Sequence, residues 1–445
     1  MRNKKSELFY SICPICQKKI KAKLLFSEGK VFISKKCPIH GEFIEEHTWD
    51  DIKTYNFMIS NFSSFLRKME NIPHGLIVDI TSKCNLNCPL CFKKNYPEED
   101  VSSILSKIKK ATKKIRFSTI FLFGGEPTIR EDLFYIIKEL KKMNLDVSLF
   151  TNGIKLKDEE YVKKLKTIGL DAVTLSLDSL DDNVYKKLRG TKLLKIKLLA
   201  LRNLKKFKIP TSLFVVVTNL NTTDDVVGII NLKLKFNNLH TIYLSTITKE
   251  GTYPKDILPI SSSKRINIIT RQFKIKKEEI YATTTFERLI VELLYKYLKK
   301  PLKYSSPFCD LVSYFYTTSK HIIPLTKIIN LEAINEELSK EIIKKPSILR
   351  IPKIGGIIFK SFTFKSLFFK TSFLLFKNLL PIKKRSKISI PSLFLRIVIT
   401  KFQDRYTLDL RSFKTCNLYA LSKGGNIEPF CSRLIFEEEN SSTTL

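Results

Sequence analysis

Between about residues 70 and 250, short apolar segments rich in β-branched residues alternate with amphipathic, lysine-rich segments. Apolar runs of this length are typical of buried parallel strands, and the segments between them have the period of helices that pack on such a sheet. The alternation predicts an α/β fold whose parallel strands are joined by right-handed crossovers. Six such units in about 175 residues fit a partial (β/α)6 barrel better than a complete eight-unit barrel.

The expected strands are Leu76–Thr81, Thr119–Phe123, Asp146–Thr151, Ala172–Leu177, Ser212–Thr218 and Thr241–Ser245. The clearest expected helices are Ile104–Ile115, Leu133–Met143 and Tyr161–Ile168. In parallel α/β folds the chemistry collects at the carboxyl ends of the strands. The motifs that directly follow these strands are therefore the first candidates for a functional site.

Two segments flank this core. Residues 1–50 cannot bury much apolar surface and carry two cysteine-containing turns, so we expect a small metal-binding domain of the rubredoxin or zinc-ribbon type. Residues 255–445 are expected to form an α+β C-terminal domain for substrate and auxiliary-cluster binding. Within it, residues 342–403 contain no Asp or Glu and 14 Lys or Arg, mixed with Phe, Leu and Ile.

The net charge of +35 favours anionic partners, unless it reflects only a lysine-rich composition. No apolar run follows the basic start Met1–Glu7, and no uninterrupted run of 18 apolar residues occurs, so we expect neither a secretory signal nor a membrane-spanning helix. The expected location is cytoplasmic, at most peripheral on the cytoplasmic membrane face. There the nine cysteines would serve as metal ligands rather than form disulfides.

A loop with three cysteines follows directly on the first expected strand, with Cys84, Cys88 and Cys91 in a C-x3-C-x2-C spacing. Three thiolates leave one iron of a [4Fe-4S] cluster without a protein ligand, and that iron is open to a small molecule. The alternatives are a zinc knuckle and three ordinary core cysteines. Because structural zinc takes four ligands and this loop offers three, the spacing favours an iron–sulfur cluster.

Gly124, Gly125 and Glu126, followed by proline, come directly after the second expected strand. Together with the three-cysteine loop, this segment resembles the radical S-adenosylmethionine (SAM) superfamily over residues 75–250. The resemblance implies an enzyme that cleaves SAM reductively at the cluster to a 5′-deoxyadenosyl radical, with electrons from a ferredoxin-like or flavodoxin-like donor. Oxygen would inactivate such an enzyme by destroying the cluster.

The same resemblance implies a SAM pocket at the strand ends. Its expected residues are Phe92 beside the adenine, Gly124, Gly125 and Glu126 at the methionine amino group, and Ser176 and Asp178 at the ribose or methionine end. Arg189 has the planar guanidinium that suits the SAM carboxylate. Asn152 and Asn219 also end strands and are weaker candidates. The alternative for each polar residue is a cap or a turn former.

Four potential ligands near the N-terminus form two knuckles, Cys13 with Cys16 and Cys37 with His40. Each knuckle supplies two ligands from one turn, and two turns complete a tetrahedron for zinc or iron. His40 departs from an all-cysteine set, which favours zinc. The alternative is two unrelated cysteine turns.

Three cysteines remain, Cys309, Cys416 and Cys431. The segment from Phe402 to Arg411 and the cysteines after it resemble the radical SAM group that includes archaeal tetraether lipid synthase and pterin-methylating proteins. In that group extra cysteines hold auxiliary clusters. Three cysteines suffice for one such cluster but not for two, and Cys309 alone would also suit a buried apolar position.

Several functions remain open at this point. The resemblance favours radical chemistry on the hydrocarbon chains of membrane lipids, with tetraether-type C–C bond formation, and residues 342–403 would then meet anionic head groups. The alternatives are a radical SAM methyltransferase acting on a pterin-like small molecule and a peptide-modifying maturase. A non-enzymatic relic that binds membrane or nucleic acid is the fourth. The intact cysteine loop argues against a relic, and residues 342–403 are too apolar for nucleic acid.

Overall fold

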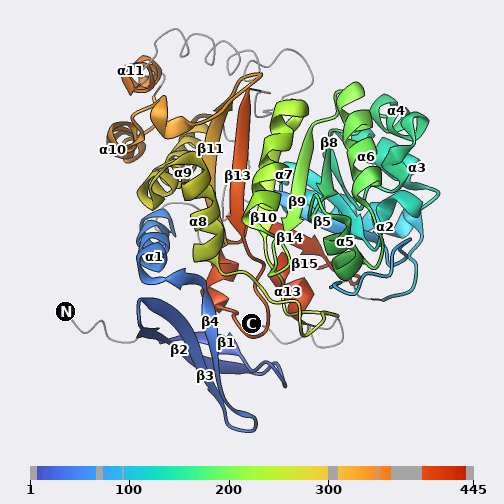
Figure 1. Ribbon diagram of the computed structural model, residues 1–445, viewed down its shortest axis with the longest axis horizontal. Coiled ribbons are helices and arrows are strands. Elements are labelled where there is room, and N and C mark those ends of the chain that lie inside the picture. Colours follow the sequence, from blue (N-terminus) through green and yellow to red (C-terminus); the bar gives the residue numbers. More distant parts are fainter. Residues whose placement is uncertain are drawn as a thin grey trace.

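The computed structural model describes residues 8–66, 74–92, 95–298, 309–347, 350–361 and 393–436. The N-terminal residues form an antiparallel sheet and one helix, which Figure 1 shows beside the larger body of the protein. These elements are β1 (Leu8–Ile12), β2 (Lys19–Ser27), β3 (Lys30–Cys37), β4 (Gly41–Asp51) and α1 (Ile52–Leu66).

The central segment confirms the expected strand–helix alternation. Its elements are β5 (Gly75–Thr81), α2 (Val101–Lys114), β6 (Thr119–Gly124), η1 (Pro127–Ile129), α3 (Leu133–Lys142), β7 (Asp146–Thr151), η2 (Lys155–Lys157), α4 (Glu159–Thr167), β8 (Ala172–Ser176), α5 (Asp182–Arg189), α6 (Leu194–Lys206), β9 (Thr211–Val216), α7 (Thr223–Lys235) and β10 (Leu239–Ser245). Strands β5 to β10 pair in parallel in chain order. The predicted six-unit α/β core is therefore present, with strand ends within a few residues of those expected.

The remaining elements extend this sheet at both of its edges. They are α8 (Ser262–Phe273), α9 (Lys277–Leu298), β11 (Asp310–Thr317), β12 (Ile322–Pro324), η3 (Leu325–Lys327), α10 (Leu331–Ile342), α11 (Ile351–Ser361), β13 (Phe394–Thr400), η5 (Leu410–Thr415), β14 (Leu418–Leu421), β15 (Ile427–Pro429) and α13 (Phe430–Ile435). The sheet order is β12-β11-β13-β10-β9-β8-β7-β6-β5-β14-β15. Because β13 pairs in parallel with β10 and β14 with β5, eight parallel strands lie side by side.

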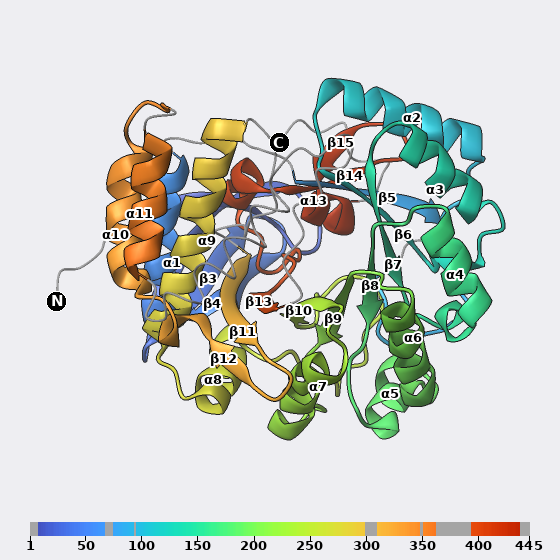
Figure 2. The same cartoon turned by 90° about the horizontal axis from the view of Figure 1, so that it is seen from above.

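The curved sheet has its helices on the outside and α13 on its concave side (Figure 2). Strands from residues 310–429 thus complete the sheet that strands from residues 75–245 begin. The residue ranges that we expect for separate domains, 1–50, 70–250 and 255–445, stay a prediction. The sheet itself runs across the last of these boundaries.

Local sequence signals explain where the helices begin and end. The Asp100 side chain accepts hydrogen bonds from the backbone N–H groups of Ser102 and Ser103 and so caps α2. Asp158 caps α4 in the same way. Gly190 ends α5 in the left-handed region with a φ of 80°, a conformation that costs glycine little. A Cβ on Gly190 would lie 3.4 Å from the Asn87 carbonyl oxygen, so the end of α5 lies against the cysteine loop.

The N-terminal sheet packs on the segment that follows β13. The Ser11 hydroxyl donates to the Leu408 carbonyl over 2.7 Å, and the Lys35 Nζ donates to the Arg405 carbonyl over 2.7 Å. Lys249, which follows β10, forms an ion pair with Glu45 at 2.9 Å. Burial lowers the pKa of Lys35 to about 8, which reflects how fully this contact excludes water.

Among the described helices, none combines the length and the apolar character that a membrane crossing requires. Of the basic, apolar residues 342–403, residues 348–349 and 362–392 lie outside the described part of the chain. A contact of this stretch with lipid head groups therefore stays a prediction.

His47 on β4 makes the stability of the fold depend on pH. Its ring is buried, the Trp49 backbone N–H donates to its Nδ1 over 3.0 Å, and burial lowers its pKa to about 3. In the unfolded chain this ring is protonated as the pH falls through about 6.5, whereas the folded chain resists protonation down to about 3. The free energy of unfolding should therefore fall by about 2 kcal/mol between pH 7 and pH 5 because of this residue alone.

Denaturant unfolding of the wild type and of His47→Gln at pH 7 and pH 5 measures this dependence. The variant should be less stable at pH 7 and should lose about 2 kcal/mol less on acidification than the wild type. Equal losses in the two proteins would contradict the assignment.

Candidate functional site

A cavity of about 290 Å³ lies inside the curve of the parallel strands. All eight parallel strands contribute lining residues, from β14 through β5–β10 to β13: Leu418, Ile77, Phe121, Phe150, Thr174, Phe214, Tyr243 and Arg396. Cys84, Cys88 and Cys91 line the same cavity and are each half-buried. The volume is close to the lower end of the range for small-molecule sites.

Three separate elements hold the cysteine loop in place. Cys91 and Thr252 exchange backbone hydrogen bonds of 2.9 and 2.8 Å. The Arg189 guanidinium donates to the Leu90 carbonyl over 3.1 Å, and the Asn152 side chain donates to Asn85 Oδ1 over 2.7 Å. The loop is therefore fixed from the segment after β10, from the end of α5 and from the end of β7.

Gly124 and Gly125 bring the end of β6 against the backbone at the start of the cysteine loop. The Gly125 N–H donates to the Thr81 carbonyl over 2.7 Å, and the Glu126 N–H donates to the Lys83 carbonyl over 2.8 Å. A Cβ on either glycine would lie 2.1 Å from one of these carbonyl oxygens, so no larger residue fits. We expected these glycines at the methionine amino group of SAM; the close backbone approach that the structure shows is to residues 81–83.

The Glu126 carboxylate is buried and accepts several hydrogen bonds. Thr128 and Thr151 donate their hydroxyls to Oε1 over 2.5 and 2.7 Å, and the Asn152 backbone N–H donates to Oε2 over 2.7 Å. Burial raises its pKa, and these donors oppose the rise. Glu126 lines the cavity, and its carboxylate also connects the ends of β6 and β7.

Asp178 and Arg189 satisfy each other. The guanidinium donates from Nε to Oδ2 over 2.8 Å and from Nη2 to Oδ1 over 2.9 Å. Burial opposes ionisation of the fully buried Asp178, but the guanidinium holds the pKa of this carboxyl below its usual range. We expected the guanidinium of Arg189 to bind the SAM carboxylate. In the structure its Nε and Nη2 donate to Asp178 instead.

The structure brings most of the predicted SAM-pocket residues to the cavity and leaves two away from it. Phe92, Gly124, Gly125, Glu126, Asn152, Ser176 and Arg189 line the cavity. Asp178 lies behind Arg189, and Asn219 hydrogen-bonds to the segment at 256–258 instead. Their roles toward SAM stay predictions.

Lys197 on α6 lines the cavity, although the sequence does not single it out. It lies in a lysine-rich helix whose other lysines are ordinary surface residues, so no local pattern distinguishes it. Its Nζ donates to the Asn152 carbonyl over 2.5 Å and to the Ser176 hydroxyl over 3.0 Å. Arg396 on β13 is a second unpredicted cation of the lining, and it is paired with Glu287 at 2.9 Å.

Five phenylalanines of the cavity lining form a closed ring of contacts, and we call it the phenylalanine collar. Its members are Phe123, Phe150, Phe214, Phe402 and Phe430, all of which line the cavity. Successive ring centroids around the collar are 5.2, 5.8, 5.9, 4.9 and 6.1 Å apart. Such aromatic contacts add about 0.5–1.5 kcal/mol per pair. They attach the C-terminal segment to the barrel and make this part of the cavity apolar.

The three C-terminal cysteines also reach the cavity wall. Cys309, Cys416 and Cys431 all line it. The Cys416 thiol donates to the Leu418 carbonyl over 2.9 Å, and the Gln403 backbone N–H donates to the Cys431 sulfur over 3.3 Å. Burial raises the pKa of Cys416 to about 11 and that of Cys431 further still. An auxiliary cluster at these residues stays a prediction.

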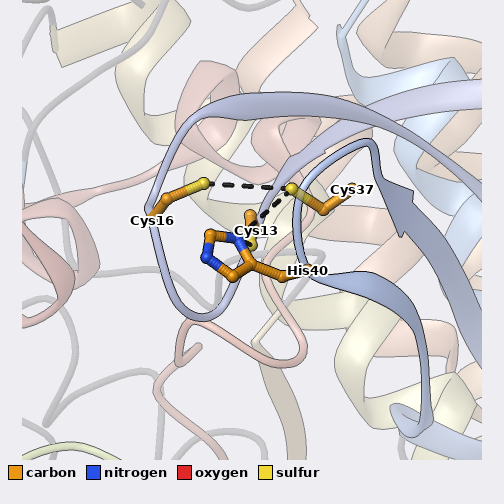
Figure 3. A group of neighbouring side chains, drawn as sticks. All are labelled: Cys13, Cys16, Cys37 and His40. Atoms are coloured by element: carbon orange, nitrogen blue, oxygen red, sulfur yellow. Dashed lines mark hydrogen bonds between the residues drawn. The ribbon is translucent and has the colours of Figure 1, made fainter.

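The two knuckles of the N-terminal sheet meet as predicted, and Figure 3 shows the four side chains facing one another. His40 Nδ1 lies 3.5 Å from the sulfurs of both Cys13 and Cys37, and the Cys16 and Cys37 sulfurs are 3.9 Å apart. Ligands of tetrahedral zinc lie about 3.5–3.8 Å apart, given bonds of about 2.3 Å to sulfur and 2.0 Å to nitrogen. The backbone N–H of Ile39 lowers the pKa of Cys37 to about 6, which favours the thiolate that binds metal.

Two family models match the chain. Residues 78–232 match the radical SAM superfamily, and residues 6–47 match a domain described as the HMPTM N-terminal zinc ribbon domain. Three thiols at the cavity edge and four ligands at tetrahedral spacing are donor sets that fit an iron–sulfur cluster and a zinc ion. The protein is therefore a radical SAM enzyme with an N-terminal metal-binding ribbon, and its cofactors are a [4Fe-4S] cluster and SAM.

Among its relatives, the chain is similar to 7,8-dihydro-6-hydroxymethylpterin dimethyltransferase of Methanocaldococcus jannaschii, with 29% identity covering 95% of this chain and 92% of the relative. It is 40% identical to a probable GTP 3',8-cyclase of Methanococcus aeolicus, but over only 26% of this chain and 41% of that protein. Among solved structures, SuiB of Streptococcus suis bound to S-adenosylmethionine is 14% identical with a TM-score of 0.40, covering 56% of this chain and 68% of that one.

Loss of one cysteine ligand of the ribbon should have two measurable effects. Cys37→Ser should lose about one bound zinc per chain and lower the melting temperature, because a structural zinc stabilises the fold that supplies its ligands. Elemental analysis for zinc and iron, together with calorimetry, measures both effects. Lys21→Ser on the neighbouring strand is the matched control and should keep its zinc. Full zinc content in Cys37→Ser would contradict the site.

Proposed function

We propose that the protein is a radical SAM methyltransferase that acts on a pterin-like heterocycle. The observation that carries this proposal is the similarity to the pterin dimethyltransferase, which extends over nearly the whole of both chains and includes the ribbon and the C-terminal segment. The lipid substrate that we favoured from sequence resemblance has no comparable support. The methyltransferase alternative is accordingly the better-supported one.

We propose that Cys84, Cys88 and Cys91 hold the cluster and that Gly124–Glu126, Ser176 and Phe92 face SAM. When bound, the cluster and SAM would supply the radical chemistry that activates a C–H bond. The chain's own part is to fix the cysteine loop through Thr252, Arg189 and Asn152, as described above. The phenylalanine collar excludes water and offers flat apolar faces to a planar substrate.

Residues 255–445 supply the other side of the substrate site in this proposal. Phe402 and Phe430 come from this segment and complete the collar, and Arg396 adds a paired guanidinium to the lining. A buried guanidinium held by a carboxylate presents N–H donors at a defined place, which suits the carbonyl and ring nitrogens of a pterin. An electron donor is the partner that radical SAM chemistry requires.

Anaerobic assay with reductant, methyl-labelled SAM and a reduced hydroxymethylpterin tests the function. The wild type should form methylated pterin together with 5′-deoxyadenosine. Absence of the label from the pterin would contradict the transfer of a methyl group from SAM. Cleavage of SAM with no methylated pterin would overturn the proposed function.

The triple variant Cys84→Ala/Cys88→Ala/Cys91→Ala is the matched control. It should lose about four irons per chain and all SAM cleavage, because a cubane cluster holds four irons. It should keep the ribbon zinc, since Cys13, Cys16, Cys37 and His40 are unchanged. Unaltered iron content would contradict the cluster assignment.

A hydrocarbon substrate is the second candidate, and one observation favours it. The collar is made only of phenylalanines, and the cavity continues from the cysteine loop to His74 and Arg396 near the opposite ends of the strands. An apolar cavity that runs along the strands accommodates part of an alkyl chain as well as a flat ring. The two substrates differ in how much they depend on stacking.

Phe150→Leu separates the two candidates, because leucine keeps the apolar character of the wall and removes the aromatic face. For a stacked pterin the KM should rise about fivefold, since an aromatic contact contributes about 1 kcal/mol. For an alkyl chain the KM should stay within about twofold. Steady-state kinetics with both substrate classes measures this, and Phe134→Leu on the outer helix α3 is the control. An unchanged pterin KM in Phe150→Leu would count against stacking.

A further inference from the structure

Lys197 is a buried ammonium inside the apolar face of helix α6. Its side chain is 1% exposed, whereas its helix neighbours Ala200, Leu201 and Leu204 belong to the hydrophobic core. Removing an ammonium from water is costly, and burial lowers the pKa of Lys197 to about 8. A leucine at this position would pack more favourably, so the lysine needs an explanation beyond stability.

The two acceptors of Lys197 are both strand-end groups at the cavity. Nζ donates to the main-chain carbonyl of Asn152, directly after β7, and to the hydroxyl of Ser176, the last residue of β8. Lys197, Asn152 and Ser176 all line the cavity. One side chain therefore fixes the relative position of two neighbouring strand ends at the proposed cofactor site.

Asn152 is held from three directions at once. Its N–H donates to Glu126 Oε2 over 2.7 Å, its carbonyl accepts from Lys197, and its side chain donates to Asn85 Oδ1 in the cysteine loop. Lys197 is thus connected through a single residue both to the Gly-Gly-Glu segment and to the loop that carries Cys84. Movement of the Asn152 peptide would disturb both.

The charges around Lys197 make it part of one electrostatic unit. The carboxylates of Glu126 and Asp178 attract its ammonium, and the Arg189 guanidinium repels it. Lys197 is therefore a second cation, beside Arg189, that faces the carboxyl groups of Asp178 and Glu126. SAM carries a positive sulfonium and a negative carboxylate, so its binding site needs charged groups that complement both.

We propose that Lys197 is a positioning residue of the SAM site, which holds the Asn152 carbonyl and the Ser176 hydroxyl in the orientation that the cofactor requires. This inference rests on the proposed function in one respect only, namely that the cavity at the cysteine loop binds SAM. It does not depend on whether the substrate is a pterin.

The chain offers a matched control in Lys233 on α7. Its side chain is 2% exposed, its Nζ donates to the carbonyls of Leu239 and Asn237 over 2.6 and 3.2 Å, and burial lowers its pKa to about 8. Lys233 does not line the cavity. Replacing either lysine removes a buried ammonium of the same kind, but only Lys197 touches the proposed cofactor site.

The experiment compares Lys197→Met and Lys233→Met after anaerobic reconstitution of the holoenzyme. Equilibrium binding of SAM, iron content and thermal melting are measured for both, with KM and kcat for SAM cleavage. Lys197→Met should bind SAM about tenfold more weakly, because it loses the net contribution of one or two hydrogen bonds. Its iron content should equal that of the wild type. Lys233→Met should bind SAM as the wild type does. The rise in KM should exceed the fall in kcat.

Lys197→Gln, which keeps an N–H donor and loses the charge, should show an intermediate SAM affinity and provides a measurement if the methionine variant does not fold. Wild-type SAM affinity in Lys197→Met, or an equal loss in Lys233→Met, would overturn the proposal. SAM binding by the wild type without methylated pterin would overturn the proposed function and leave this test intact.

Discussion

The backbone contact between the end of β6 and the start of the cysteine loop is the constraint on which the candidate site depends. Two hydrogen bonds, from the N–H groups of Gly125 and Glu126 to carbonyls of residues 81 and 83, leave no room for a side chain at 124 or 125. The loop with Cys84 starts at this contact, and hydrogen bonds from Thr252, Arg189 and Asn152 hold the rest of it. The Glu126 carboxylate then extends the contact to the end of β7.

The interior of the barrel is built from compensated charges rather than from apolar residues alone. Asp178 pairs with Arg189, Glu287 with Arg396, and Lys197 lies within the influence of Glu126 and Asp178. Ion pairs of this kind contribute little to stability once their desolvation is included. Only the cations of the two pairs, Arg189 and Arg396, line the cavity, together with Lys197 and Glu126.

The C-terminal segment connects the site to the metal-binding ribbon. It supplies β13 and β14 to the two edges of the parallel set, Phe402 and Phe430 to the collar, and the carbonyls that accept from Ser11 and Lys35 of the ribbon. A fold in which one segment performs all three tasks couples the integrity of the ribbon to the shape of the cavity.

Hydrophobic period and ligand spacing are local properties of the chain, and from them we predicted the six-strand α/β core, the three-cysteine loop and the four-ligand knuckle set. Resemblance to the radical SAM superfamily also indicated Ser176 and Glu126 as residues of the expected SAM pocket. Only the tertiary structure decided that β13 and β14 complete the parallel set, that five phenylalanines from distant segments close into a ring, and that Asp178 engages Arg189. It alone distinguishes Lys197 from the surface lysines of its helix. These are contacts between residues far apart in the chain, and their formation depends on the packing of the whole sheet rather than on any short pattern.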